Sequence, residues 1–326
     1  MRVLSNGDYK LFERLVSLSQ KEVHKAMAQF LKAKYNNVIF TKDYLVAIGD
    51  IPIALVAHMD TVFKTPVSNL YYDQRKGVMW SPEGLGADDR AGVFAILKII
   101  QDGFRPSVIF TTDEEKGGLG ACELASIDCP IPNLKYMIEL DRRGSNDCVF
   151  YDCYCPEFVQ YVESFGFCEK WGSFSDISFL MAEWNVCGVN LSVGYDDEHS
   201  YTEVLHVGAL FDTIRKVKKM LQETAIPEFK YDENPAASSM WWRKQDVYGQ
   251  HCSKCKKLFS EYELIPVKGL DNRMKFYCPD CIVGNVGWCY ECGEAFELES
   301  SAKNDKMCKD CAEGLCTKTS EISSNQ

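Results

Sequence analysis

Residues 51–61 read Ile51-Pro52-Ile53-Ala54-Leu55-Val56-Ala57-His58-Met59-Asp60-Thr61, an apolar run that ends in a histidine and an aspartate. A short run that is apolar at successive positions predicts a strand buried on both faces of a sheet. Its two polar residues come where such a strand would leave the core. Because α/β proteins build sites at the carboxyl ends of their strands, this run predicts both a central strand and a site.

Strand-like and helical segments alternate on both sides of this run. Further strands are predicted at 38–40, 44–48, 107–112, 136–140 and 186–193. Helices are predicted where apolar residues recur at helical spacing, at 9–34, 91–101, 156–165, 176–184 and 207–224. This alternation predicts an α/β sheet covered by helices.

Other apolar runs in the first two hundred positions also end in, or lead to, acidic and histidine residues. Two histidines and at least three carboxylates are what a pair of hydrolytic zinc ions needs. One carboxylate must bridge the two ions, and Asp88 is the candidate. Glu115 and His199 would complete one metal site, and His58 and Asp141 the other.

Two further carboxylates are assigned catalytic roles. Asp60 lies two residues beyond His58, so on an extended strand it can hydrogen-bond the second ring nitrogen and fix the tautomer. Adjacent carboxylates diverge, so Glu115 can bind metal while Glu114 faces the attacking water as general base. Each motif alone also has a structural explanation, since a Glu-Glu pair is usually solvated and one residue of Asp88-Asp89 fits a helix N-cap.

In combination, these motifs resemble the co-catalytic dizinc peptidase superfamily, which includes the M20, M28 and M42 aminopeptidases, carboxypeptidases and deacylases. The resemblance covers roughly residues 10–222 and rests on Ala57–Val62, Gly86–Gly92, Thr112–Gly118, Glu139–Asp141, Gly172–Asp176 and Asp197–Glu203. It implies a three-layer α/β sandwich around a mixed β-sheet. It also implies that Asp88 bridges the metals and that Glu114 is the base.

The sequence departs from many M20 members, which insert a lid or dimerisation domain before the final histidine ligand. Only residues 142–198 separate Asp141 from His199, so a compact catalytic domain without a lid is expected over residues 1–224. A lid histidine from a partner is therefore not assumed. The group that stabilises the oxyanion stays open, since its candidates, Tyr201 and Arg90, also have structural explanations.

A cysteine-rich region follows a break in this pattern. Residues 225–250 predict a linker, and residues 317–326 predict a disordered tail. Between them, residues 251–316 hold four Cys-x-x-Cys pairs, at Cys252 and Cys255, Cys278 and Cys281, Cys289 and Cys292, and Cys308 and Cys311. Two such pairs make a closed tetrahedral Cys₄ site, so we expect two zinc ribbon-like modules with one structural zinc each, the first from the first two pairs and the second from the last two. Pairs that interleave between the modules stay open.

Composition limits the partners and the compartment. The formal net charge is −11, which disfavours nonspecific binding to nucleic acid phosphates. No segment reaches the length of a membrane span, and residues 1–34 lack the apolar core of a signal peptide. Cys-x-x-Cys pairs indicate zinc in a reducing compartment, so a cytoplasmic location is expected.

The function expected from these residues is metal-dependent hydrolysis of a peptide or another amide bond, such as that of an N-acyl amino acid. Zinc is the expected catalytic metal, although carboxylate-rich dinuclear sites also accept cobalt or manganese. The alternative is a scaffold whose zinc ribbons bind a protein partner, or less readily nucleic acid. The substrate, the terminus attacked and the oligomeric state stay open at this stage.

Overall fold

The structure is a computed structural model that describes residues 4–232, 250–259, 264–270, 274–282, 285–289 and 295–298. The chain divides into two compact units, Met1–Met240 and Trp241–Gln326. The predicted tail at 317–326 and three predicted ligands, Cys292, Cys308 and Cys311, lie outside the described residues. Among the helices of the described residues, none combines the length and the apolar character needed to cross a membrane.

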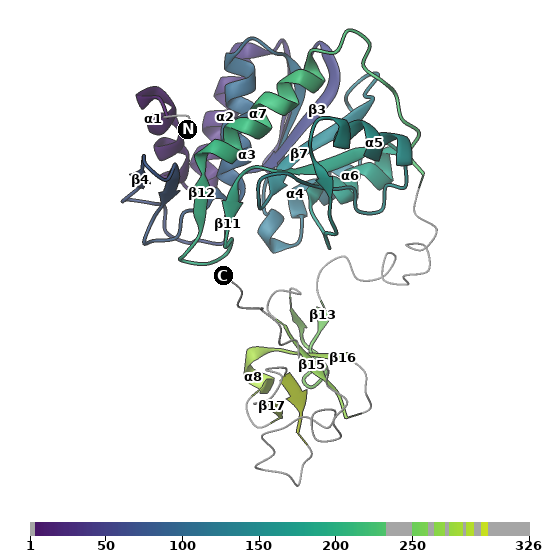
Figure 1. Cartoon of the computed structure of the whole chain (residues 1–326). Helices are drawn as coiled ribbons and strands as arrows, with labels where there is room; N and C mark the ends of the chain where they lie inside the picture. Colours follow the sequence, from purple (N-terminus) through teal and green to yellow (C-terminus); the bar gives the residue numbers. More distant parts are fainter. Residues whose placement is uncertain are drawn as a thin grey trace, which may run out of the picture. The chain divides into compact units, whose positions relative to one another are not determined.

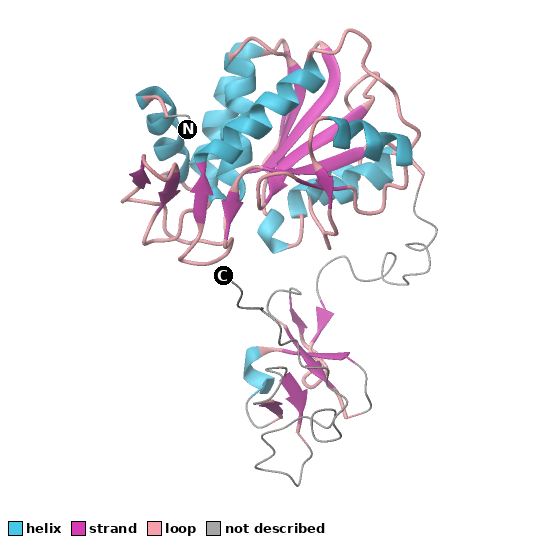
Figure 2. Ribbon diagram, in the orientation of Figure 1, coloured by secondary structure: helices cyan, strands magenta, loops and turns pink. Residues whose placement is uncertain are grey.

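The first unit is organised around a mixed sheet of eight strands (Figures 1 and 2). Its order is β1(Asn37–Phe40), β2(Tyr44–Ile48), β6(Pro106–Thr111), β3(Ile51–His58), β7(Tyr136–Arg142), β10(Gly188–Ser192), β8(Asp147–Val149) and β9(Cys168–Glu169). Strands β6, β3, β7 and β10 run parallel to one another. The pairs β1–β2, β2–β6 and β10–β8 are antiparallel, and β9 pairs parallel with β8. The predicted strand at 51–58 is confirmed as a central one, buried from Ile53 to His58.

Helices cover both faces of this sheet, which gives the three layers that the motif resemblance implied (Figure 1). Helices α3(Ala87–Gln101) and α7(Val207–Leu221) pack together on one face, where α3 contacts β3 and β7. Helices α4(Leu119–Ala125) and α6(Asp176–Trp184) pack together on the other. Helix α5(Pro156–Ser164) begins at the proline that was predicted to open it. Helix α3 is apolar almost all round because it is buried along nearly its whole length.

The single helix predicted at 9–34 is wrong. The structure has two helices there, α1(Asn6–Val16) and α2(Gln20–Lys34). The break has a local cause, since the backbone N–H of Ser19 donates to the Glu22 carboxylate and the Ser19 hydroxyl accepts from the Glu22 N–H. This reciprocal capping box starts a new helix at Gln20.

A second, smaller sheet was not predicted. Its order is β11(Tyr195–Asp196), β12(Val204–His206), β5(Val78–Trp80) and β4(Tyr71–Asp73). Each strand has two or three residues, too few to show a period in the sequence. The sheet nevertheless matters for the site, because the turn between β11 and β12 carries His199, and β5 leads towards the start of α3.

Part of the segment predicted as a linker packs on the first unit. Phe229 packs against the rings of Tyr136, Phe158 and Tyr161 in T-shaped and tilted contacts, and Tyr231 is buried. Lys135 donates a hydrogen bond to the backbone carbonyl of Ile226. These apolar contacts bind the chain to the first unit as far as residue 232.

The second unit is small. Its described elements are β13(Gln250–His251), β14(Leu258–Phe259), β15(Ile265–Lys268), β16(Met274–Tyr277), α8(Pro279–Ile282), β17(Val286–Trp288) and β18(Ala295–Glu297). Strands β13 and β14 form a hairpin ladder, and the other four strands form a sheet in the order β16-β15-β18-β17. Its main buried apolar cluster consists of Val267, Tyr277, Val286 and Ala295.

Candidate metal centre

The predicted site residues converge at the carboxyl ends of three neighbouring parallel strands. His58 is the last residue of β3 and lies opposite Thr111, the last residue of β6. Asp141 lies near the end of β7, on the other side of β3. The loop after β6 contains η1(Glu114–Lys116), which carries both glutamates. The sheet order therefore brings residues from distant parts of the sequence to one edge.

The first group of possible ligands is His58, Asp88 and Asp141. The Nε2 atom of His58 lies 3.0 Å from Oδ1 of Asp88 and 3.5 Å from Oδ1 of Asp141. His58 is almost fully buried. Burial alone would lower the pKa of His58, but the carboxylates of Asp141, Asp60 and Asp88 outweigh it and raise that pKa.

The second group is Asp88, Glu115 and His199. The Nε2 atom of His199 lies 3.1 Å from Oδ2 of Asp88 and 3.1 Å from Oε2 of Glu115. Hydrogen bonds to these two carboxylates raise the pKa of His199 to about 10. Asp88 thus presents one carboxylate oxygen to each histidine, which is the arrangement expected of a bridging ligand.

Asp60 supports both His58 and the loop with the glutamates. Its Oδ1 atom lies 3.2 Å from Nδ1 of His58 and accepts a hydrogen bond from the Glu114 N–H at 3.1 Å. Its Oδ2 atom accepts from the Glu115 N–H at 3.0 Å. Burial opposes ionisation of Asp60, but these hydrogen bonds and His58 lower its pKa below the ordinary value.

Glu114 lies beside the two groups without belonging to either. Burial raises its pKa well above the ordinary value. The nearby carboxylates of Asp141, Asp176 and Glu115 add to this effect, while His58 opposes it. A carboxylate with a raised pKa can both accept and return a proton near neutral pH.

The donor set fits divalent cations. Each histidine Nε2 faces two carboxylate oxygens at once, although a single N–H can donate well to only one of them. The Oε1 atom of Glu115 is buried and has no hydrogen-bond partner among the described residues. Burial, together with the Asp88 charge, raises the pKa of Asp141 to about 6. Cations between these oxygens and nitrogens would relieve the repulsion and supply the missing partners.

Three side chains hold Asp141 in place, and only Ser175 among them belongs to a segment that the sequence singled out. The Asp141 carboxylate accepts from the hydroxyls of Tyr195 at 3.0 Å and Ser175 at 3.1 Å. Its backbone exchanges two hydrogen bonds with the Asn190 side chain. Ser175 and Asn190 also contact each other, so the support is a connected network. These partners are 34–54 residues from Asp141 in sequence and become its neighbours only through the sheet.

The adjacent residues Asp88, Asp89 and Arg90 have separate tasks. Asp89 accepts a hydrogen bond from the Gly92 N–H at 2.8 Å and so caps the regular part of α3. Arg90 is buried and donates to the carbonyls of Leu15 and Leu18. Arg90 therefore ties α3 to the turn between α1 and α2.

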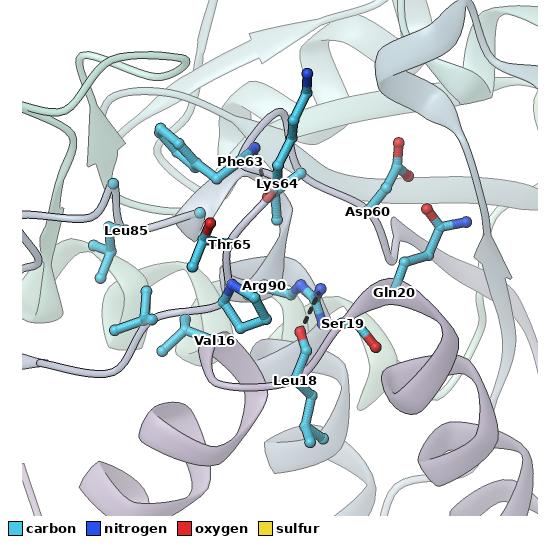
Figure 3. Close-up of a pocket in the computed structure, with 15 residues that line it drawn as sticks. Val16, Leu18, Ser19, Gln20, Asp60, Phe63, Lys64, Thr65, Leu85 and Arg90 are labelled. Carbon is cyan, nitrogen blue, oxygen red and sulfur yellow. Dashed lines mark hydrogen bonds between the residues drawn. The ribbon is translucent and has the colours of Figure 1, made fainter.

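A cavity of about 200 Å³ lies beside Asp60 (Figure 3). Figure 3 shows Gln20, Phe63, Lys64 and Arg90 around it, with the Arg90 guanidinium bonded to the Leu18 carbonyl. The lining comes from the α1–α2 turn, from residues 60–67 and from the segment before α3. Of the proposed site residues, only Asp60 contributes to this lining.

The second unit contains a separate group of four thiols. The sulfur atoms of Cys252, Cys255, Cys278 and Cys281 all lie within 4.8 Å of one another, which brings together one predicted set of four. Burial raises the pKa of the Cys252 thiol, but hydrogen bonds from the backbone N–H groups of Cys278, Cys255 and Lys254 outweigh it and lower that pKa to about 6. Cys289 is buried, but the residues predicted to join it lie outside the described part of the chain.

No protein-family model matches this chain, and no curated protein sequence does. Solved structures do match. A tripeptidase from Staphylococcus aureus subsp. aureus Mu50 is 14% identical with a TM-score of 0.54, over 67% of this chain and 97% of that chain. The TET aminopeptidase from a marine sediment archaeon, Thaumarchaeota archaeon SCGC AB-539-E09, is 14% identical with a TM-score of 0.54, over 68% of this chain and 98% of that chain. The chain therefore shares the fold of these peptidases, as the resemblance of its motifs predicted.

Proposed function

We propose that the first unit is a metal-dependent hydrolase that cleaves a peptide or a related amide bond with two divalent ions. The observation that supports this most is the pair of ligand groups, His58 with Asp141 and Glu115 with His199, which share Asp88. Zinc is the proposed metal because the set combines imidazole and carboxylate ligands, although cobalt or manganese would also suit it. When bound, the ions would supply Lewis acidity, which polarises a carbonyl and acidifies a water molecule.

Glu114, Asp60 and the side chains around Asp141 each have a defined part in the proposed reaction. Glu114 removes a proton from the attacking water and later gives it to the leaving amine nitrogen. Asp60 fixes the His58 ring through Nδ1 and holds the backbone of Glu114 and Glu115. The network around Asp141 keeps its carboxylate aimed at His58.

The proposed substrates are peptides, in line with the names of the structural neighbours, a tripeptidase and an aminopeptidase. N-acyl amino acids are the second substrate class, since the chemistry at the reacting carbonyl is the same. A cytoplasmic location is proposed with this function. The second unit is proposed to hold a structural zinc at Cys252, Cys255, Cys278 and Cys281 and to contact a protein partner.

The test is hydrolysis of a mixed panel by the purified protein with added zinc or cobalt, beside Glu114→Gln. The panel holds dipeptides, tripeptides, peptides blocked at either end and N-acyl amino acids. We expect cleavage of at least one class and a loss of about 10²- to 10⁴-fold in kcat in the variant, with metal content retained. Normal turnover by Glu114→Gln would refute the mechanism. A metal-loaded wild type that cleaves nothing would favour the scaffold alternative.

A further inference from the structure

A buried glutamate outside both ligand groups connects the two segments that carry Asp88 and His199. Glu203 is 1% exposed and follows His199 by four positions, just before β12. Its Oε2 atom accepts a hydrogen bond from the Gly86 N–H at 2.6 Å. Its Oε1 atom accepts from the Asp88 N–H at 3.0 Å. One carboxylate therefore holds the backbone on both sides of Ala87.

The backbone around Asp88 departs from helical geometry, so its N–H groups need acceptors from outside the helix. Gly86 is left-handed (φ 62°), and Asp88 and Asp89 have non-helical angles at the start of α3. Gly86 is the N-cap residue of α3 and has no side chain, so the N-cap position offers no side-chain acceptor to the backbone N–H groups at the start of the helix. Glu203 supplies the acceptor from another element.

Glu203 also belongs to the turn that carries His199. Its own N–H donates to the Ser200 carbonyl at 3.1 Å, and the Ser200 hydroxyl donates to the Asp197 carbonyl at 2.7 Å. His199 in this turn is left-handed (φ 62°), so its ring position depends on the turn. Movement at Glu203 would therefore change the separation of His199 and Asp88, which lie 3.1 Å apart at Nε2 and Oδ2.

We propose that Glu203 is a positioning residue that holds Asp88 and His199 in register and thereby sets the affinity of the site for its pair of divalent ions. This inference rests on the proposed dinuclear site. Glu203 is treated as a support and not as a ligand, because it belongs to neither ligand group. A purely structural cap would affect folding stability alone, so metal affinity separates the two roles.

The experiment compares Glu203→Gln with wild type and with a matched control, Glu83→Gln. Glu83 also accepts two backbone N–H groups, from Ser68 and Asn69, but contacts no proposed ligand. Cobalt is titrated into each metal-free protein against a competing chelator. The absorption of the first site is separated from the thiolate-to-cobalt bands of the cysteine cluster, and thermal unfolding of each metal-free protein is recorded.

We expect Glu203→Gln to lower cobalt affinity at the first site about 10- to 100-fold and to change its ligand-field spectrum. Glu83→Gln should leave both unchanged. Wild-type affinity and spectrum in Glu203→Gln would overturn the inference while leaving the dinuclear site intact. A wild-type protein that binds no cobalt pair at the first site would instead overturn the proposed function and the inference with it.

A second variant covers the case in which Glu203→Gln does not fold. Glu203→Asp keeps the carboxyl group but is shorter by one methylene group, so it cannot reach the N–H groups of both Gly86 and Asp88 without movement. We expect its cobalt affinity to fall as well, which would show that the reach of the side chain matters and not the carboxyl group alone. Wild-type affinity in a folded Glu203→Asp protein would overturn the inference.

Discussion

The two candidate metal sites differ in how they relate to the fold around them. The first draws its ligands from five segments between His58 and His199, and these segments are attached to a large buried core. The second draws four cysteines from residues 252–281, and among the described residues the buried cluster at these cysteines adds Leu264 to Cys252 and Cys278. In the first unit the fold positions the proposed ligands, whereas in the described part of the second unit the cysteines form one of two small buried clusters.

This difference predicts opposite consequences of metal loss. A unit with a large core pays for its ordering through apolar burial and keeps its structure without metal. A unit with few buried apolar side chains depends on the free energy of metal binding, which is folding free energy in such domains. The predictions below test this contrast, beginning with the largest effect.

Chelation should unfold the second unit and leave the first folded. Structural zinc supplies roughly 10–16 kcal/mol in small zinc modules, which is more than the stability that a core of this size could provide. Hydrogen exchange measured by mass spectrometry should show that β15 and β16 lose protection after chelation, while β3 and β7 keep theirs. Protection of β15 and β16 that survives complete removal of zinc would contradict the contrast.

Metal affinity at the first site should fall as the pH is lowered. The pKa of His199 is raised to about 10 in the metal-free protein, so its ring is protonated at pH 6–8 and a metal ion must displace that proton. Below this pKa, the affinity changes about tenfold per pH unit for each proton released. Cobalt titrations at pH 6, 7 and 8 should therefore show affinity rising by about 100-fold or more. An affinity that stays constant over this range would refute the argument.

Asp60→Asn should weaken the first site without unfolding it. The variant removes the negative charge that holds the His58 ring and two backbone N–H groups, so metal affinity should fall about 10- to 100-fold. Asp113→Asn is the matched control from the same loop, since Asp113 pairs with the exposed Lys116. Isothermal titration should find the control equal to wild type. Equal losses in both variants would mean that the loop, rather than the contact with His58, controls binding.

The central sheet and the predicted ligands were recognisable in the sequence because each is a local pattern. His58, Asp88, Glu115, Asp141 and His199 lie at the ends of apolar runs or within short motifs, and the parallel sheet then brings strand ends together. The capping box of Ser19 and Glu22 was also a local signal. Apolar residues nevertheless continue at helical spacing across the break at residues 17–19, and this pattern favours a single helix.

The supporting residues could not be predicted in the same way. Asn190 and Tyr195 support Asp141, and Glu203 supports Asp88, through contacts across 49, 54 and 115 residues of sequence. Glu203 falls within the motif Asp197–Glu203, but that motif does not indicate which backbone groups it contacts. Neither the type nor the spacing of Asn190 and Tyr195 distinguishes them from other polar residues near strands. The thiol cluster is intermediate, since the order of the Cys-x-x-Cys pairs predicted its four ligands, although pairs that interleave between the modules stayed open.

The smallest expected effect tests whether the first unit tolerates damage away from its site. Ser19→Ala removes the side-chain half of the capping box of α2 and should lower the free energy of unfolding by about 1 kcal/mol. Ser17→Ala is the control, because the Ser17 hydroxyl only donates to the Arg14 carbonyl at the end of α1 and should matter less. Denaturant unfolding would measure both variants, and cobalt titration should give wild-type affinity for each.

If the fold holds the proposed ligands, as the contrast requires, a loss of about 1 kcal/mol in the free energy of unfolding leaves the position of Asp60 unchanged. A fall in metal affinity in Ser19→Ala alone would show that the α1–α2 turn, which Arg90 ties to α3, is part of the site.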